Sequence, residues 1–133
     1  MAIEARLDAV GIIVADMGKA LAFYRLLGAP VPAGAEHAPH VEVVFPSGMR
    51  LLFDTEAVVR SFHAGWEPPT GAGRLGLAFA VDSPADVDAL HAEATADGYR
   101  SELDPFDAPW GQRYATLLDP DGNGVDLFAP LPS

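Results

Sequence analysis

The feature that most constrains the fold is a repeated order of structural signals in the two halves of the chain. Residues 9–28 (AVGIIVADMGKALAFYRLLG) run from an apolar, β-branched segment through a helix-capping aspartate to a glycine. Residues 76–98 (GLAFAVDSPADVDALHAEATADG) repeat that order, with Ser83 as the cap and Pro84 at the first helical position. A turn followed by an apolar strand then recurs in FPSGMRLLFD and DPDGNGVDLFA. The two sequences have diverged, but the order of their elements indicates an internal repeat.

This repeat predicts a single α+β domain built from two βαβββ modules, at about residues 6–54 and 74–129. Residues 55–73 start with a candidate short helix at Glu56–Phe62 and continue as a Pro- and Gly-rich linker. Two such modules make two curved sheets, and we expect their concave faces to form a ligand cleft. The expected strands are residues 7–14, 41–45, 49–53, 75–81, 99–103, 112–118 and 124–128.

Composition excludes several classes of function. The net charge of -11 repels nucleic acid and anionic lipid, although it weakly favours amine-bearing ligands. The chain has no cysteine, which excludes disulfides, zinc ribbons and thiol catalysis. No apolar run is long enough to span a membrane. We expect no signal peptide, because the first residues lack a basic region followed by a long apolar run. We therefore expect a cytoplasmic protein without nucleic-acid or membrane partners.

Three motifs of the chain resemble the vicinal oxygen chelate superfamily of glyoxalases, extradiol dioxygenases and bleomycin resistance proteins. They are FYRLLG in the first half, WGQR before a late strand, and DPDGNGVDLF in the last hairpin, and the resemblance covers residues 6–129. The segments APHVEVVF, GMRLLFDTEAVVRSF and PWGQRYATLLDPDGNGVDLFAPLP are similar to the mitomycin-binding members of that superfamily. The resemblance implies a homodimer whose paired halves complete two clefts.

The metal-ligand positions of the superfamily are mostly filled by side chains that cannot bind a metal. In the metal-using members the ligands come from the first and last strands of each half. The matching residues here are Ala9, Gly76 and either Leu51 or Leu52, depending on the alignment, and only Asp126 offers a carboxylate. One carboxylate cannot hold a catalytic ion, and the four histidines are scattered. We expect no metal, no cofactor and no catalytic residue.

Flat side chains are the other candidates for a site. The resemblance places Trp110 and His40 next to the ligand, and each offset stack on a planar ring adds about 0.5–1.5 kcal/mol beyond burial. The alternative for Trp110 is a packing role, and Arg113 could form an ion pair instead of contacting a ligand. Phe53 faces the cleft or the core, depending on the phase of its strand. The predicted ligand-binding set is His40, Phe53, Phe62, Phe106, Trp110, Arg113 and Tyr114.

These observations favour binding without turnover. The first hypothesis is metal-independent sequestration of an aromatic small molecule, an antibiotic of mitomycin or bleomycin type, and thus drug resistance. The alternative is a metal-dependent glyoxalase- or dioxygenase-like enzyme with a degenerate or unrecognised site. A third is a small-molecule-sensing or accessory domain.

Overall fold

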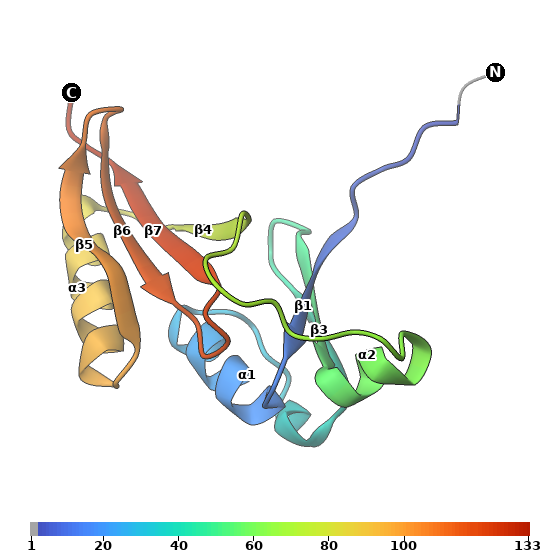
Figure 1. Ribbon diagram of the computed structural model, residues 1–133. Coiled ribbons are helices and arrows are strands. Elements are labelled where there is room, and N and C mark those ends of the chain that lie inside the picture. Colours follow the sequence, from blue (N-terminus) through green and yellow to red (C-terminus); the bar gives the residue numbers. More distant parts are fainter. Residues whose placement is uncertain (1–2) are drawn as a thin grey trace. The chain divides into compact units, whose positions relative to one another are not determined.

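The computed structural model describes residues 3–133, and the chain divides into two compact units, Met1–Glu67 and Pro68–Ser133. The boundary falls inside residues 55–73, the segment predicted as a linker. Each unit has its own curved mixed sheet, of three strands in the first and four in the second (Figure 1). The predicted α+β class is thereby confirmed, while the ligand cleft between concave faces stays a prediction.

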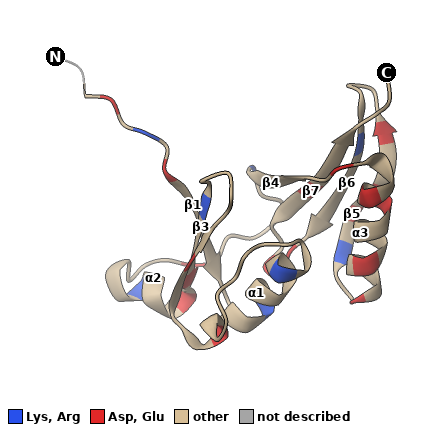
Figure 2. Ribbon diagram, turned by 180° about the vertical axis from the view of Figure 1, so that it is seen from behind, with Lys and Arg blue, Asp and Glu red and all other residues tan. Residues whose placement is uncertain are grey.

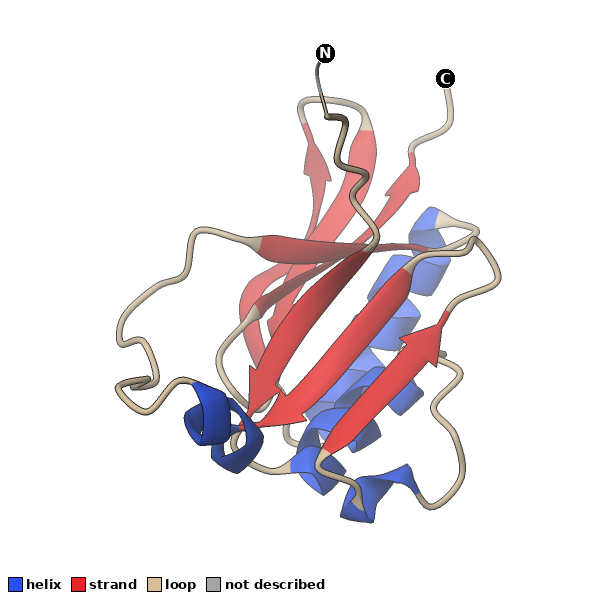
Figure 3. Ribbon diagram, turned by 90° about the vertical axis from the view of Figure 1, so that its right-hand side faces the viewer, coloured by secondary structure: helices blue, strands red, loops and turns tan. Residues whose placement is uncertain are grey.

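The first unit is a three-stranded sheet with helices. Its strand order is β1-β3-β2, with β1 parallel and β2 antiparallel to the central β3, and the three strands lie side by side in Figure 3. Its elements are β1 (Ala9–Val14), α1 (Met17–Leu26), the 3-10 helix η1 (Ala35–His37), β2 (His40–Val44), β3 (Arg50–Thr55) and α2 (Glu56–Phe62).

This first module is βαββ rather than the predicted βαβββ, because residues 27–39 contain no strand. That segment holds Pro30, Pro32 and Pro39, which cannot donate to a strand ladder, and it forms only η1. The predicted short helix at Glu56–Phe62 is confirmed as α2.

The second unit is a four-stranded sheet covered on one face by a helix. Its strand order is β4-β7-β6-β5, with β4 parallel to β7 and the other pairs antiparallel. Helix α3 contacts β5, β6 and β7 along one side of the sheet (Figure 1). Its elements are β4 (Gly76–Ala80), α3 (Pro84–Ala96), β5 (Arg100–Ala108), β6 (Gln112–Leu118) and β7 (Gly124–Pro130).

Local side-chain chemistry sets the ends of these elements. The carboxylate of Asp16 accepts from the backbone amide of Lys19 at 2.9 Å and begins α1, and the hydroxyl of Ser83 accepts from the amide of Asp86 at 3.2 Å and begins α3. In the β6–β7 turn, the buried Asp119 accepts three hydrogen bonds of 2.8–2.9 Å from Asp121 and Asn123. The predicted caps and hairpin turn are therefore confirmed.

The core of each unit follows the alternation of its strands. In the first unit Leu51 and Phe53 of β3 are buried, and the Phe53 ring lies 5.3 Å from that of Tyr24 in α1. In the second unit Leu117 and Leu127 are fully buried on the side of α3. The longest helix described, α3, has 13 residues, and no helix in residues 3–133 could cross a membrane.

Candidate functional site

The sheet of the second unit has a face turned away from α3, here called the open face. Strand registers place its residues in three rows that run across β4, β7, β6 and β5. The first row is Ala80, Phe128, Tyr114 and Phe106; the second is Ala78, Asp126, Thr116 and Leu103; the third is Gly76, Gly124, Leu118 and Arg100.

Three rings form an aromatic cluster at one end of the open face, namely Phe106, Trp110 and Tyr114. The Trp110 ring lies edge-on to Tyr114 at 5.3 Å and to Phe106 at 6.3 Å, while Phe106 and Tyr114 are 6.0 Å apart. The indole N–H donates to Oε1 of Gln112 at 2.8 Å, which fixes the ring orientation. Trp110 is nevertheless 60% exposed, so a large flat surface is held in place and left open.

The turn that carries Trp110 depends on the glycine that follows it. Gly111 has a φ of 93°, a left-handed conformation that side chains beyond glycine rarely adopt. Its amide donates to the carbonyl of Ala108 at 3.0 Å and closes the turn between β5 and β6. The WGQR motif therefore supplies the ring, the turn and the Gln112 acceptor in four residues.

Asp126 lies at the centre of the open face and is held by two hydroxyl groups. Thr116 Oγ1 donates to Oδ1 of Asp126 at 2.7 Å, and the Tyr114 hydroxyl donates to Oδ2. Burial, then the hydrogen bond to Asp126 and then its charge raise the pKa of Tyr114 to about 12. Tyr114 thus stays protonated as the donor, and both carboxylate oxygens already have a partner.

The raised pKa of Tyr114 predicts that this tyrosine ionises at a higher pH than a free tyrosine in an alkaline titration. Because the folded chain raises this pKa from 10.0 to about 12, the stability it contributes is fully present below about pH 10 and is lost as the pH rises through 12. Tyrosinate absorbance should show one transition near pH 12 that is missing in Tyr114→Phe. An identical titration curve for the two proteins would contradict the Asp126 hydrogen bond.

The residues at the positions that the resemblance assigns to metal ligands do not fit a metal ion. Leu52 is the counterpart of Asp126, because Leu52 pairs with Gly11 in the first unit as Asp126 pairs with Ala78 in the second. Leu51 instead faces the core. Alkyl side chains and glycine supply no ligand atom, and the oxygens of Asp126 are bonded to hydroxyls. Within residues 3–133 no group of three or more His, Asp or Glu side chains is placed to hold an ion.

His40 lies on the matching face of the first unit. It occupies the row Ile13, Asp54 and His40, which corresponds to the row of Tyr114 in the second unit. Nδ1 of His40 is 2.5 Å from Oδ1 of Asp54, and the His40 side chain is 52% exposed. Because the Asp54 carboxylate accepts, Nδ1 of His40 is the donor in this contact. That His40 and Trp110 contact one ligand stays a prediction.

Two of the predicted ligand-binding residues, Phe53 and Arg113, do not lie on the open face. The sequence left open whether Phe53 faces the cleft or the core. Its side chain is fully buried against α1 and therefore faces the core. Arg113 alternates with Tyr114 and lies on the α3 side, where Asp88 accepts two hydrogen bonds of 2.9 and 3.2 Å and Asp107 accepts one of 3.1 Å. Phe53 therefore packs in the core and Arg113 forms ion pairs, and neither side chain lies on the open face.

The remaining predicted residues divide between the two units. Phe106, Trp110 and Tyr114 come together in the aromatic cluster. Phe62 lies at the end of α2 and is 75% exposed, so it is free to contact a ligand, and its role stays a prediction.

Sequence reasoning missed the hydroxyl partners of Asp126. Thr116 could have been found, because Tyr114 and Thr116 are two residues apart on one strand and so share a face. It also missed the buried His91 of α3, whose Nε2 lies 2.7 Å from Oγ of Ser101. That Ser101 hydroxyl donates to Asp104 at 2.6 Å, so His91 donates to serine and cannot activate it as a base.

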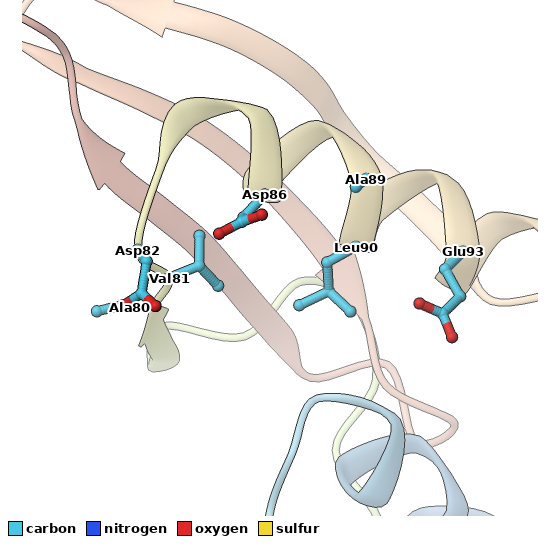
Figure 4. A pocket seen from close by; sticks show the side chains of 7 residues that line it. All are labelled: Ala80, Val81, Asp82, Asp86, Ala89, Leu90 and Glu93. Atoms are coloured by element: carbon cyan, nitrogen blue, oxygen red, sulfur yellow. The ribbon is translucent and has the colours of Figure 1, made fainter.

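A shallow acidic depression of about 450 Å³ lies between the end of β4 and one side of α3 (Figure 4). Asp86, Leu90 and Glu93 point to the same side of the helix there. The depression contains none of the predicted site residues and no aromatic ring, and it touches the first row only at Ala80. The aromatic cluster and Asp126 are therefore the better candidate for a small-molecule site.

Comparison with known proteins agrees with this fold. A family model described as the Glyoxalase/Bleomycin resistance protein/Dioxygenase superfamily matches residues 6–127. The chain belongs to this superfamily. No curated protein matches the sequence.

Several solved structures are similar in fold to this chain. A glyoxalase/bleomycin resistance protein/dioxygenase family enzyme from Burkholderia phytofirmans has a TM-score of 0.81 at 23% identity, covering 96% of this chain and 100% of that one. A hypothetical protein from S. aureus has a TM-score of 0.78 at 16% identity, with 97% and 95% covered. A lactoylglutathione lyase from Agrobacterium tumefaciens has a TM-score of 0.67 at 23% identity, with 95% and 94% covered. At such identities these likenesses show the fold alone.

Proposed function

We propose that this superfamily member binds and sequesters a planar aromatic small molecule on the open face of its second unit, without a metal. The observation that carries the proposal is Trp110, an indole that is 60% exposed yet held by two edge-on rings and by Gln112. A ring that is already ordered loses little conformational freedom when a ligand stacks on it. The site is thus prepared for stacking before the ligand arrives.

The chemistry of the open face supports binding rather than turnover. Apart from Thr116, Asp126 and Arg100, its rows carry aromatic, aliphatic and glycine residues. Both oxygens of the central Asp126 accept hydrogen bonds from hydroxyl groups. The family's ligand positions at Ala9, Leu52 and Gly76 offer neither a metal ligand nor an acid or base. A protein of this kind would confer resistance by mass action, because a bound antibiotic cannot reach its target.

The ligand class proposed is an antibiotic of mitomycin or bleomycin type. The support is the likeness of several segments to mitomycin-binding members, together with the suitability of Trp110 for a planar ring. A homodimer, which the same likeness implies, is part of the proposal, as is a contribution from His40.

Calorimetric titration of the metal-stripped protein with mitomycin C and with bleomycin tests this function. The expected result is saturable binding of at least one drug, which chromatography then recovers chemically unchanged. Size-exclusion chromatography with light scattering should give twice the mass of one chain. Absence of binding to both drugs, together with turnover of a glyoxalase or dioxygenase substrate after a divalent metal is added, would favour the enzyme alternative.

A further inference from the structure

The negative charge of the protein is concentrated in the second unit. Residues 68–133 contain eleven Asp and Glu side chains against three Arg, whereas the first unit has eight acidic and five basic residues. Of the three arginines, Arg113 is already bound to Asp88 and Asp107. The red segments along α3 in Figure 2 show part of this excess. The unit that carries the aromatic cluster therefore attracts cations.

Asp126 brings that charge to the centre of the open face. Its two partners, Tyr114 and Thr116, are neutral donors that orient the carboxylate without cancelling its charge. In residues 3–133 no Lys, Arg or His forms an ion pair with Asp126. A partly buried, uncompensated carboxylate beside aromatic rings is a favourable partner for an organic cation.

A second carboxylate lies on the same face. Oε2 of Glu102 is 4.0 Å from the position that a Cβ of Gly124 would occupy, and the Thr116 methyl is 3.9 Å from that position. Gly124 is one row from Asp126, so Glu102 adds its charge to the same region. Arg100 ends the third row at β5, and no ion pair joins it to either carboxylate in the described residues.

The neighbouring strand leaves room beside Asp126. Strand β4 presents only Gly76, Ala78 and Ala80 on the open face, and Ala78 is the residue paired with Asp126. Asp126 thus lies between the small side chains of β4 and the aromatic cluster with its exposed Trp110 ring. A ligand that stacks on Trp110 can extend a charged group toward Asp126.

We propose that the ligand of the open face is an aromatic cation, with its ring on Trp110 and a protonated amine directed at Asp126. This inference rests on the proposed function and adds the charge of the ligand to it. Glu102, close to Gly124, strengthens the attraction, and the π faces of the cluster favour the same sign of charge. The proposal selects amine-bearing antibiotics over neutral or anionic ones of equal size.

Equilibrium dialysis of the full chain against two dyes with the same ring system tests the inference. The dyes are 9-aminoacridine and acridine, at a pH where the first is protonated and the second neutral. The cation should bind about tenfold more tightly or better, and added salt should reduce that preference. Equal affinities would overturn the inference but leave the proposed function intact, whereas binding of neither dye would overturn both.

Two variants and a control locate the charge that is responsible. Asp126→Asn should reduce the preference for the cation to about threefold or less, and Glu102→Gln should reduce it by about two- to threefold. Asp97→Asn removes the same charge from an exposed position at the end of α3 and should leave the preference unchanged. Retention of the full preference in both Asp126→Asn and Glu102→Gln would overturn the inference, and Glu102→Gln serves alone if Asp126→Asn does not fold.

Discussion

Replacing Trp110 with alanine should weaken the binding of a planar aromatic ligand more than tenfold, a loss of over about 1.4 kcal/mol. The indole supplies the exposed ring surface of the site, and alanine removes the stacking area together with the edge contacts to Phe106 and Tyr114. Because the ring is mostly exposed, the free energy of unfolding should fall by only about 1 kcal/mol. Calorimetric titration and urea denaturation of the same preparation measure both quantities.

Two controls separate a site effect from a general one. Trp66→Ala removes the other tryptophan, which belongs to the first unit and lies 5.2 Å from the guanidinium of Arg60, and should leave the affinity unchanged. Arg113→Ala, close in sequence to Trp110, removes the hydrogen bonds to Asp88 of α3 and should also leave the ligand affinity unchanged. An affinity that is the same in Trp110→Ala and the parent would remove the aromatic cluster from the site.

Replacing Phe53 with alanine should lower the free energy of unfolding by about 3–5 kcal/mol. The ring is fully buried between β3 and α1 and touches Tyr24, so truncation leaves a cavity that the sheet cannot close. Urea denaturation measures the loss. Phe62→Ala, at the exposed end of α2, is the matched control and should change stability by about 0.5 kcal/mol or less. A small loss for Phe53→Ala would contradict the core position of this residue.

Helix starts and turns were predictable because their causes lie within a few residues. Asp16 and Ser83 cap helices through amides three positions later, and the Asp119 turn is closed by its own neighbours. The superfamily could be inferred because the repeat and the motifs fix the order of elements along the chain.

The faces of individual side chains were harder to predict, because a strand side chain changes face with every residue. Tyr114 and Arg113 are neighbours in sequence, but one joins the aromatic cluster and the other binds α3. In β5, two register shifts between Ser101 and Phe106, on either side of Leu103, break the alternation, and Pro105 cannot donate to the ladder. The phase of such a strand depends on partners that are distant in sequence.

The candidate site was only partly predictable for the same reason. The sequence indicated Trp110 and the lone carboxylate Asp126 as separate features. Their relation through Tyr114, which contacts the indole ring and donates to Asp126, depends on the register of β6 with β7. Strand registers also resolve the alignment choice between Leu51 and Leu52 in favour of Leu52 as the counterpart of Asp126.

Metal-independent binding at Trp110 is tested most directly with a variant that has one tryptophan. In Trp66→Phe the only indole is that of Trp110, so any change in tryptophan fluorescence reports on the aromatic cluster. The variant, kept in a metal chelator, is titrated with mitomycin C and with bleomycin. Quenching that saturates at one ligand per site for either drug is the predicted result. Unchanged Trp110 fluorescence while calorimetry shows binding, or binding only after a divalent metal is restored, would contradict it.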